Sequence, residues 1–387
     1  MTERRGPRRL LFLINDARFF VTHILPLARA AVAAGYDTHV ALPFQGAALD
    51  MADALSAIRA CGAHLHDLPL RRGGMAWRGE IAALCAIARL MAHLRPDILH
   101  AITIKPVLYG GLIARLLRTR RVIFFITGLG HVFIAQGFRA SVRRRMVMSA
   151  YRMVLRYRRG MTVFENEEDR CLFTDAKLVQ RDHTVLIRGC GVDSAVFHPA
   201  TIAPPEPLVV LLPARLQNEK GVREFVAAAE LLRNAGEKVR MAMVGYADFD
   251  RPGGVSEEEL NGWCARGLVE WWGHSTTMPD TLRQVHIVCL PSYREGFPKT
   301  LIEAAAAGLP IVTCDVPGCR DAVRAGETAL LVPPRNATAL ADAIACLIHD
   351  PEMRASMGVR GRDLAVKEHS LERFVNANLA LYARPPA

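Results

Sequence analysis

Short apolar runs alternate with segments of helical length along the first half of this chain. Residues 20–34 and 77–94 have the apolar spacing of helices. The apolar runs that we expect to be strands are 9–16, 37–43, 63–70, 97–102, 116–128 and 161–166. Strands that alternate with helices of this length are typical of βαβ units, which place the strands in a parallel sheet. The first half therefore predicts a doubly wound α/β domain.

The second half repeats this alternation after a proline-rich stretch. Residues 197–207 contain four prolines and no helical spacing, which indicates a linker. Beyond it we expect strands at 208–216, 239–245, 268–274, 285–292 and 310–318. The pattern predicts two α/β domains, residues 1–200 and 201–369. In doubly wound sheets, ligands bind beyond the carboxyl ends of the strands, so we expect the cleft between the domains to hold the site.

Composition excludes several classes of protein. Half of the 387 residues are apolar (51%), which is enough for a full core and excludes intrinsic disorder. The nine cysteines are scattered and form no CxxC pair, so neither a disulfide scaffold nor a zinc site is expected. No stretch approaches the ~20 apolar residues of a membrane span, and the N-terminal apolar run is too short for a signal peptide. We therefore expect a cytoplasmic protein.

Positive charge is concentrated in one segment. The formal net charge is +11, yet residues 98–164 alone contain 13 basic and no acidic residues. A helix over Arg139–Arg159 would place Val142, Met146, Met153 and Tyr157 near one face among arginines. Such a basic amphipathic surface predicts contact with an anionic membrane surface. A merely solvated basic helix is the alternative. Nucleic-acid binding is disfavoured because no recognition motif accompanies the charge.

The stretch 290–323 contains two glutamates eight residues apart, Glu295 and Glu303, followed by the small-residue helix EAAAAG. Ser292, Gly296, Phe297, Pro298, Gly308 and Pro310 flank them. This combination resembles the C-terminal signature of retaining glycosyltransferases of the GT-B fold, in particular glycosyltransferase family 4. The resemblance extends over nearly the whole chain and implies two Rossmann-like domains that face each other across a cleft. It also implies that the last helix, 370–387, packs back on the N-terminal domain.

The resemblance implies that Glu295 faces the donor sugar and that Glu303 accepts hydrogen bonds from the ribose hydroxyls. An alternative for Glu303 is a capping box with Thr300. The implied catalytic residues are Glu295, Arg215 and Lys220, the last two bracketing the diphosphate, whose negative charge grows as the glycosidic bond breaks. The implied donor-binding residues are Gly296, Phe297, Pro298, Thr300, Leu301, Glu303, Gly273 and His274.

No metal or cofactor is expected. Asp248 and Asp250 have the spacing of the divalent-metal motif of a different glycosyltransferase fold, but they follow an expected strand and precede RPGG, which favours a turn. The nucleotide sugar is a substrate, so the resemblance implies no cofactor.

The N-terminal half resembles the family 4 branch that acts on lipid-linked oligosaccharides and surface-polysaccharide intermediates. The glycine-rich loop that many relatives carry after the first strand is missing, so no glycine–phosphate contact is expected there. The acceptor-side candidates are Asn15, Asp16, Phe19, His23, Lys105, Thr127, Gly128 and His131.

Taken together, the resemblance implies a metal-independent, retaining glycosyltransferase. It would move a hexose or N-acetylhexosamine from a nucleoside-diphosphate sugar, with UDP expected, to a polyprenyl-diphosphate-linked saccharide in cell-surface polysaccharide or glycan assembly. The enzyme would be peripheral on the inner face of the cell membrane. The alternatives are a sugar-nucleotide epimerase of the same fold and a non-catalytic protein that binds sugar nucleotides or anionic lipid.

Overall fold

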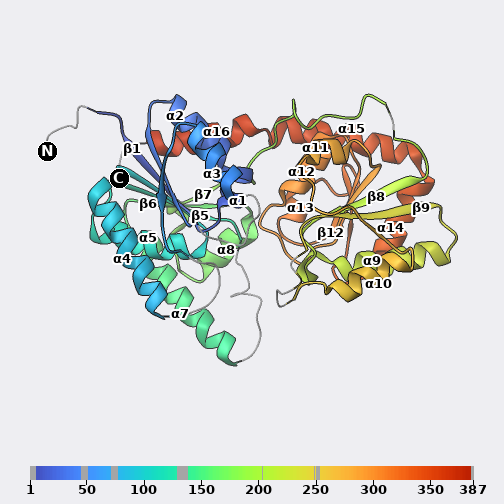
Figure 1. Ribbon diagram of the computed structural model, residues 1–387, viewed down its shortest axis with the longest axis horizontal. Coiled ribbons are helices and arrows are strands. Elements are labelled where there is room, and N and C mark those ends of the chain that lie inside the picture. Colours follow the sequence, from blue (N-terminus) through green and yellow to red (C-terminus); the bar gives the residue numbers. More distant parts are fainter. Residues whose placement is uncertain are drawn as a thin grey trace. The chain divides into compact units, whose positions relative to one another are not determined.

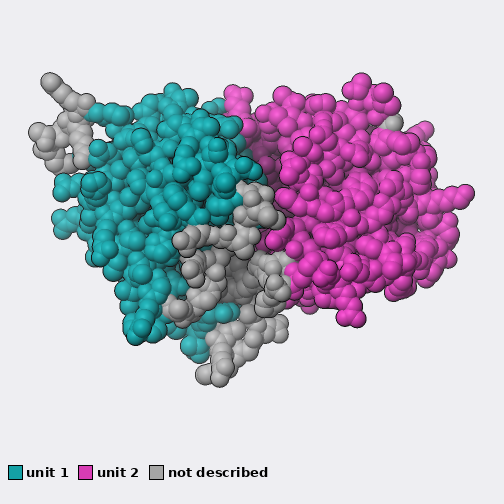
Figure 2. Space-filling view, viewed as in Figure 1, with its two compact units in different colours: residues 1–190, 374–387 teal, residues 191–373 magenta. Residues whose placement is uncertain are grey.

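The computed structural model describes residues 6–44, 51–70, 77–128, 138–202, 204–247, 249 and 253–384. The chain forms two compact units, residues 1–190 with 374–387 and residues 191–373 (Figure 2). Each unit is built on a parallel sheet with helices on both faces, as the alternating pattern predicts (Figure 1).

The sheet of the first unit has the strand order β3-β2-β1-β4-β5-β6-β7, and every neighbouring pair is parallel. Its strands are β1 (Arg9–Leu13), β2 (Asp37–Leu42), β3 (His64–Asp67), β4 (Ile98–Ile102), β5 (Arg121–Ile126), β6 (Gly160–Phe164) and β7 (Thr184–Leu186). The central strands β1, β4 and β5 are apolar and almost completely buried, as expected for strands covered on both faces.

The helices of the first unit are α1 (Ala17–Phe19), α2 (Leu25–Ala33), α3 (Met51–Ala60), α4 (Trp77–Leu94), α5 (Ile104–Leu116), α7 (Phe138–Leu155), α8 (Glu167–Asp175) and the C-terminal α16 (Leu371–Ala383). A π-helical turn, Phe20–Ile24, joins α1 to α2, and a 3-10 turn, Arg181–His183, precedes β7. The start of α8 is set by Asn166, which accepts a hydrogen bond from the Asp169 amide, and by three acidic residues in the first turn.

Successive residues of each strand point to opposite faces of the sheet, so this unit has a packed core on each face. On one face, Leu11, Leu13 and Phe124 belong to a cluster with residues of α4, α5 and α7. On the other face, the Phe12 ring packs against Phe20 and against Tyr382 of α16, at centroid distances of 5.7 and 6.5 Å. The C-terminal helix thus covers part of the first unit's sheet (Figure 1).

The sheet of the second unit has the strand order β10-β9-β8-β11-β12-β13, again parallel throughout. The strands are β8 (Leu208–Pro213), β9 (Val239–Val244), β10 (Glu270–Trp271), β11 (Ile287–Leu290), β12 (Ile311–Cys314) and β13 (Ala329–Val332). Its helices are α9 (Val222–Asn234), α10 (Glu257–Ala265), α11 (Met278–Leu282), α12 (Lys299–Ala306), α13 (Cys319–Ala322), α14 (Ala337–His349) and α15 (Pro351–Glu368), with a 3-10 turn at Asn218–Lys220.

The division between the units lies at Cys190 and Gly191, ahead of the proline-rich stretch at which the sequence analysis places the boundary. Local pairing explains this position. Val192 forms a bridge with Ser370, and the guanidinium of Arg362 donates to the carbonyl of Phe197 at 3.1 Å, so residues 191–197 are held by the second unit. The chain passes back to the first unit at Phe374, within α16.

Among the described residues, no helix is both long enough and apolar enough to cross a membrane.

Candidate active site

In the second unit the chain winds in opposite directions from two adjacent strands. It passes from β8 toward β9 on one side and from β11 toward β12 on the other. Doubly wound sheets bind ligands beyond the carboxyl ends of such a strand pair. Arg215 and Lys220 follow β8 and Glu295 follows β11, so these residues, which the resemblance implies, lie at that position.

The structure brings Lys220 and Glu295 together, although 75 residues separate them. The Nζ atom of Lys220 lies 2.5 Å from Oε1 of Glu295, and the Oγ atom of Ser292 donates to the same oxygen at 2.7 Å. Both charged side chains are mostly buried. Among the described residues, Oε2 of Glu295 has no hydrogen-bond partner, so it is available to accept a hydrogen bond from a ligand.

A glycine permits the close approach of these two loops. Gly221 has a φ of +71°, and a Cβ atom there would lie 2.1 Å from the carbonyl oxygen of Pro291. Any other residue would push the β11 loop away from the β8 loop. The amide of Tyr293 also donates to the carbonyl of Glu219 at 2.9 Å. The backbone thus fixes the separation of the loops that carry Lys220 and Glu295.

Tyr293 lies in the same loop as Glu295 and is not among the residues expected from the sequence. Its hydroxyl donates to Oε1 of Glu224 on α9 at 2.6 Å, and the guanidinium of Arg335 lies 4.6 Å from its ring centroid. Burial, together with the hydrogen bond to Glu224, raises the pKa of Tyr293 to about 12. Its position two residues before Glu295 is the only sequence signal for it, and the partners on α9 appear only in the fold.

Arg215 lies two residues beyond β8, and its side chain is exposed. The adjacent loop approaches it closely, because a Cβ atom on Gly245 would lie 1.9 Å from the carbonyl oxygen of Ala214. The amide of Leu216 also donates to the carbonyl of Tyr246 at 3.1 Å. The loops after β8 and β9 are therefore packed together.

Glu303 lies on α12, where its side chain is 8% exposed and pairs with Nζ of Lys299 at 3.0 Å. Burial raises its pKa, and the Lys299 charge opposes that rise. The capping box with Thr300 is not formed, because Pro298 is the N-cap residue and makes no side-chain cap, which leaves Thr300 inside the helix. Among the described residues, Oε2 of Glu303 has no partner.

The other donor-side candidates cluster around the start of α12. Gly296 and Pro298 lie in the loop that leads into the helix, and a Cβ atom on Gly318 would lie 2.4 Å from the carbonyl oxygen of Gly296. Phe297 and Leu301 are buried core residues, so their side chains pack in the interior of the unit.

Gly273 and His274 follow the edge strand β10. The carbonyl of Gly273 accepts a hydrogen bond from the Gly245 amide at 2.8 Å, and Gly273 itself has a φ of +72°. The exposed His274 ring stands edge-on to Tyr246, with the ring centroids 6.5 Å apart. These residues thus lie beside the loop after β9 and, like Arg215, at the carboxyl ends of the strands.

A metal site is not evident in the part of the chain that the structure describes, where no three His, Cys, Asp or Glu residues are placed to hold an ion. Asp248 and Asp250 lie outside the described residues.

In the first unit, the equivalent change of winding direction lies between β1 and β4. Asn15 follows β1, and Thr103 follows β4. The Oγ1 atom of Thr103 donates to Oδ1 of Asn15 at 2.8 Å. Thr103 has a φ of +73°, which is an outlier for a β-branched residue, and such strain concentrates at functional sites. Asn15 is among the residues expected from the sequence. Thr103 is not, because no local pattern reveals its backbone conformation.

Asp16, Phe19 and His23 lie in the helical segment after β1. Asp16 caps α1 by accepting a hydrogen bond from the Phe19 amide at 3.0 Å. The π-helical turn stacks the Phe19 and His23 rings, which lie 4.1 Å apart with an interplanar angle of 2°. These two side chains form a flat, half-buried platform.

The remaining acceptor-side candidates are less closely associated. The Nζ atom of Lys105 donates to Glu80 of α4 at 2.7 Å, and the Tyr109 hydroxyl binds the same carboxylate, so Lys105 is engaged by a partner that the sequence does not suggest. Thr127 and Gly128 follow β5, the neighbour of β4. His131 lies outside the described residues.

Comparisons with known proteins agree with this architecture. A solved structure of Anabaena HepE in complex with UDP and glucose superposes with a TM-score of 0.77 at 16% identity, covering 97% of this chain and 99% of that one. A Campylobacter jejuni relative, N,N'-diacetylbacillosaminyl-diphospho-undecaprenol alpha-1,3-N-acetylgalactosaminyltransferase, is 27% identical over 284 residues, 70% of this chain and 73% of that protein. The D-inositol 3-phosphate glycosyltransferase of Nocardia farcinica is 36% identical over 171 residues, but these span only 36% of its length.

Two family models divide the chain between them. The model described as glycosyl transferase 4-like matches residues 9–155, and the model described as glycosyl transferases group 1 matches residues 194–364. The matched segments fall in the first and second units respectively, and the second includes Arg215, Lys220, Glu295 and Glu303. The chain therefore belongs to the glycosyltransferases, with a glycosyl transferase 4-like domain followed by a group 1 domain in a GT-B fold.

Proposed function

We propose that this glycosyltransferase moves a hexose or N-acetylhexosamine from a UDP-sugar to a polyprenyl-diphosphate-linked saccharide, with retention of configuration and without a metal ion. The observation that carries the donor side is the Lys220–Glu295 pair, which joins the loops after β8 and β11. The name of the C. jejuni relative supports the acceptor class, because that protein acts on a sugar linked to diphospho-undecaprenol.

Charge development explains the role proposed for the cations. When the bond between the sugar C1 atom and the diphosphate breaks, negative charge grows on the departing oxygen. Lys220 and Arg215, on the loop after β8, would stabilise that charge. Preorganised groups of this kind typically lower the activation barrier by about 3–4 kcal/mol. Lys220 is held by Glu295 in this structure, so donor binding would share its ammonium between the carboxylate and the diphosphate.

The two glutamates would hold the donor at its opposite ends. Oε2 of Glu295, which has no partner among the described residues, would accept a hydrogen bond from a sugar hydroxyl. Glu303 would accept hydrogen bonds from the ribose hydroxyls. In the proposed reaction the acceptor oxygen forms the new bond to C1 on the face that the diphosphate leaves, and its proton passes to a diphosphate oxygen, so no protein nucleophile is required.

The acceptor would lie beyond the carboxyl ends of β1 and β4 in the first unit. Asn15, oriented by Thr103, would contact its hydroxyl groups, and the Phe19–His23 platform would pack against a sugar ring. Because a polyprenyl chain resides in a bilayer, the enzyme would work as a peripheral protein at the inner face of the cell membrane.

The test is a transfer assay with a panel of UDP-, GDP- and ADP-sugars and a polyprenyl-diphosphate-linked saccharide, with EDTA present. We expect transfer from a UDP-sugar, an α-linked product from an α-linked donor by NMR, and loss of transfer in Lys220→Met. Lys238→Met, an exposed lysine of the same unit, is the matched control and keeps full activity. Abolition of transfer by EDTA, or an inverted product, would contradict the proposal.

A further inference from the structure

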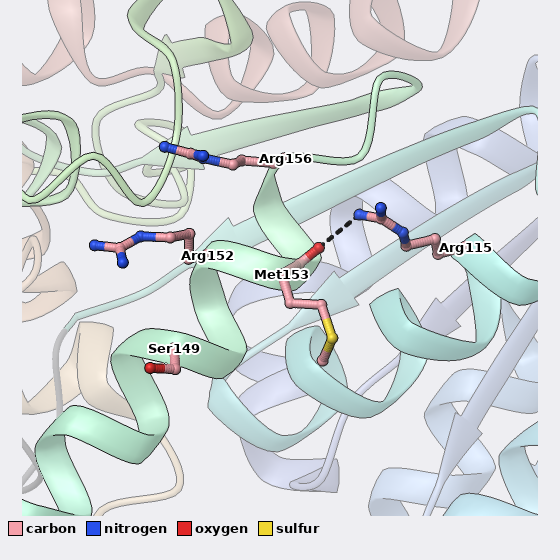
Figure 3. A pocket seen from close by; sticks show the side chains of 5 residues that line it. All are labelled: Arg115, Ser149, Arg152, Met153 and Arg156. Carbon is pink, nitrogen blue, oxygen red and sulfur yellow. Dashed lines mark hydrogen bonds between the residues drawn. The ribbon is translucent and has the colours of Figure 1, made fainter.

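A shallow, open basic cavity lies in the first unit, away from the carboxyl ends of β1 and β4. It has a volume of about 370 Å³ and is lined by Arg115 near the end of α5 and by Ser149, Arg152, Met153 and Arg156 from the last turns of α7 and just beyond. The side chains of Ser149, Arg152 and Arg156 point to the same side of α7, and Arg115 reaches toward them from α5 (Figure 3).

The three guanidinium groups are held in place without being neutralised. Arg115 donates to the carbonyl of Met153 at 2.8 Å, Arg152 to that of Ala176 at 3.0 Å, and Arg156 to that of Lys177 at 2.8 Å. Among the described residues, no carboxylate pairs with any of the three. A guanidinium has five N–H donors, so each retains donors for an anion, and arginine binds phosphate oxygens in a two-pronged geometry.

Exposed apolar side chains lie on the same two helices, α5 and α7, that line this cavity. Leu116, which follows Arg115, is 69% exposed, and Met146 on α7 is 66% exposed; Met153 in the cavity wall is also exposed. Met146 and Met153 are not the core-facing residues of α7, because that role belongs to Tyr151 and Val154, which are buried. The exposed Leu116, Met146 and Met153, together with Arg115, Arg152 and Arg156, are called the arginine patch below.

We propose that the arginine patch docks the enzyme on an anionic phospholipid surface, with a headgroup phosphate in the cavity and the leucine and methionine side chains inserted among the acyl chains. This proposal rests on the membrane location in the proposed function, and the charge of the patch complements an anionic surface. Residues 98–164, to which the patch belongs, contain 13 basic and no acidic residues, so the surface complements an anionic leaflet.

The apolar residues of the patch favour a membrane over a nucleic acid. Single-stranded nucleic acids are bound by aromatic side chains on which the bases stack. The patch contains no aromatic residue, and the nearby Tyr157 is half-buried with its hydroxyl bonded to the carbonyl of Thr119 at 2.9 Å. Leucine and methionine among arginines are instead the composition of surfaces that lie in the headgroup region.

The experiment is co-sedimentation of the full chain with two kinds of vesicle, one of phosphatidylcholine alone and one of equal parts phosphatidylcholine and phosphatidylglycerol. We expect binding to the mixed vesicles only, weakened by salt. The variant Arg152→Gln/Arg156→Gln should bind about 30-fold more weakly, at about 1 kcal/mol for each charge removed. The matched control is Arg360→Gln, since Arg360 is an exposed arginine of the second unit that likewise donates to a main-chain carbonyl.

A second pair of variants guards against misfolding, because Arg152 and Arg156 also bind carbonyls beyond the end of α8. Leu116→Ser removes an exposed side chain without any hydrogen bond, and Val359→Ser, 67% exposed in the second unit, is its control. We expect Leu116→Ser to weaken binding several-fold and Val359→Ser to leave it unchanged. Circular dichroism verifies that each variant is folded.

Three results would overturn the proposal: no binding of the wild type to mixed vesicles at low salt, equal binding to both kinds of vesicle, or equal binding by folded patch variants and the wild type. Tighter binding to a single-stranded oligonucleotide than to mixed vesicles would also overturn it in favour of a nucleic acid. The assay contains no sugar nucleotide and no acceptor. Failure of the proposed glycosyl transfer would therefore leave its result unchanged.

Discussion

Replacing Glu303 by glutamine tests the donor site most directly. The carboxylate is 8% exposed, has one ion-pair partner in Lys299, and has one oxygen without a partner among the described residues. Glutamine keeps the size and one acceptor oxygen but removes the charge. A hydrogen bond to a charged group contributes about 1.5–3 kcal/mol, so losing one such bond to a ribose hydroxyl should weaken UDP binding about 10- to 150-fold.

The substitution Glu303→Gln should change the free energy of unfolding much less than it changes the affinity for UDP. Burial raises the pKa of Glu303, which means that the folded protein disfavours the ionised carboxylate. A neutral glutamine avoids that cost but loses the pair with Lys299. We therefore expect the free energy of unfolding of the ligand-free variant to remain within about 1 kcal/mol of the wild-type value. Calorimetric titration with UDP and urea unfolding measure the two quantities separately.

The pH dependence supplies a second readout. Because the ionised carboxylate is the hydrogen-bond acceptor and its pKa is raised, wild-type affinity should begin to fall at a pH above the usual glutamate range as the solution is acidified. A UDP-sugar is the suitable ligand, since its diphosphate does not titrate there. Glu303→Gln should lack this component. Glu368→Gln, at an exposed glutamate paired with Arg324, is the control. Unchanged nucleotide affinity in Glu303→Gln would refute the reasoning.

Three further outcomes are expected. Lys220→Met should lower kcat/KM about 10²- to 10³-fold through loss of charge stabilisation, measured by initial rates beside Lys238→Met. Tyr382→Phe should lower the free energy of unfolding in urea by about 1–3 kcal/mol, because the Tyr382 hydroxyl lies 2.5 Å from Nδ1 of the buried His100. Burial lowers the pKa of His100 from 6.5 to about 3, so the unfolded chain takes up the proton first. Stability should therefore fall as the pH drops from about 6.5 toward about 3, by up to about 1.4 kcal/mol per pH unit, and less steeply in His100→Asn.

Local patterns predict the helices and strands correctly because they depend on residues close in sequence. Buried parallel strands need short apolar runs, and the helices between them need apolar residues at helical spacing, so the alternation alone specifies two parallel sheets. Glu295 and Glu303 could be named from the family resemblance because its signature is also local. One follows a strand and the other lies on the next helix, so their spacing is set by consecutive elements.

Tertiary structure decided the contacts between distant loops. Lys220 meets Glu295 across 75 residues and Thr103 meets Asn15 across 88, because the strand order makes β8 a neighbour of β11 and β1 a neighbour of β4. No local pattern encodes that order. The unformed capping box at Glu303 likewise depends on where the packed helix begins.

The basic segment shows the same division. Its charge and its apolar residues are evident from the sequence, since both are properties of composition and spacing. Which apolar residues are exposed is a property of packing, because Tyr151 and Val154 occupy the core and leave Met146 and Met153 outside. Arg115 joins Arg152 and Arg156 only because α5 packs beside α7. Sequence thus determined the chemistry that the chain carries, and the fold determined which of those groups meet.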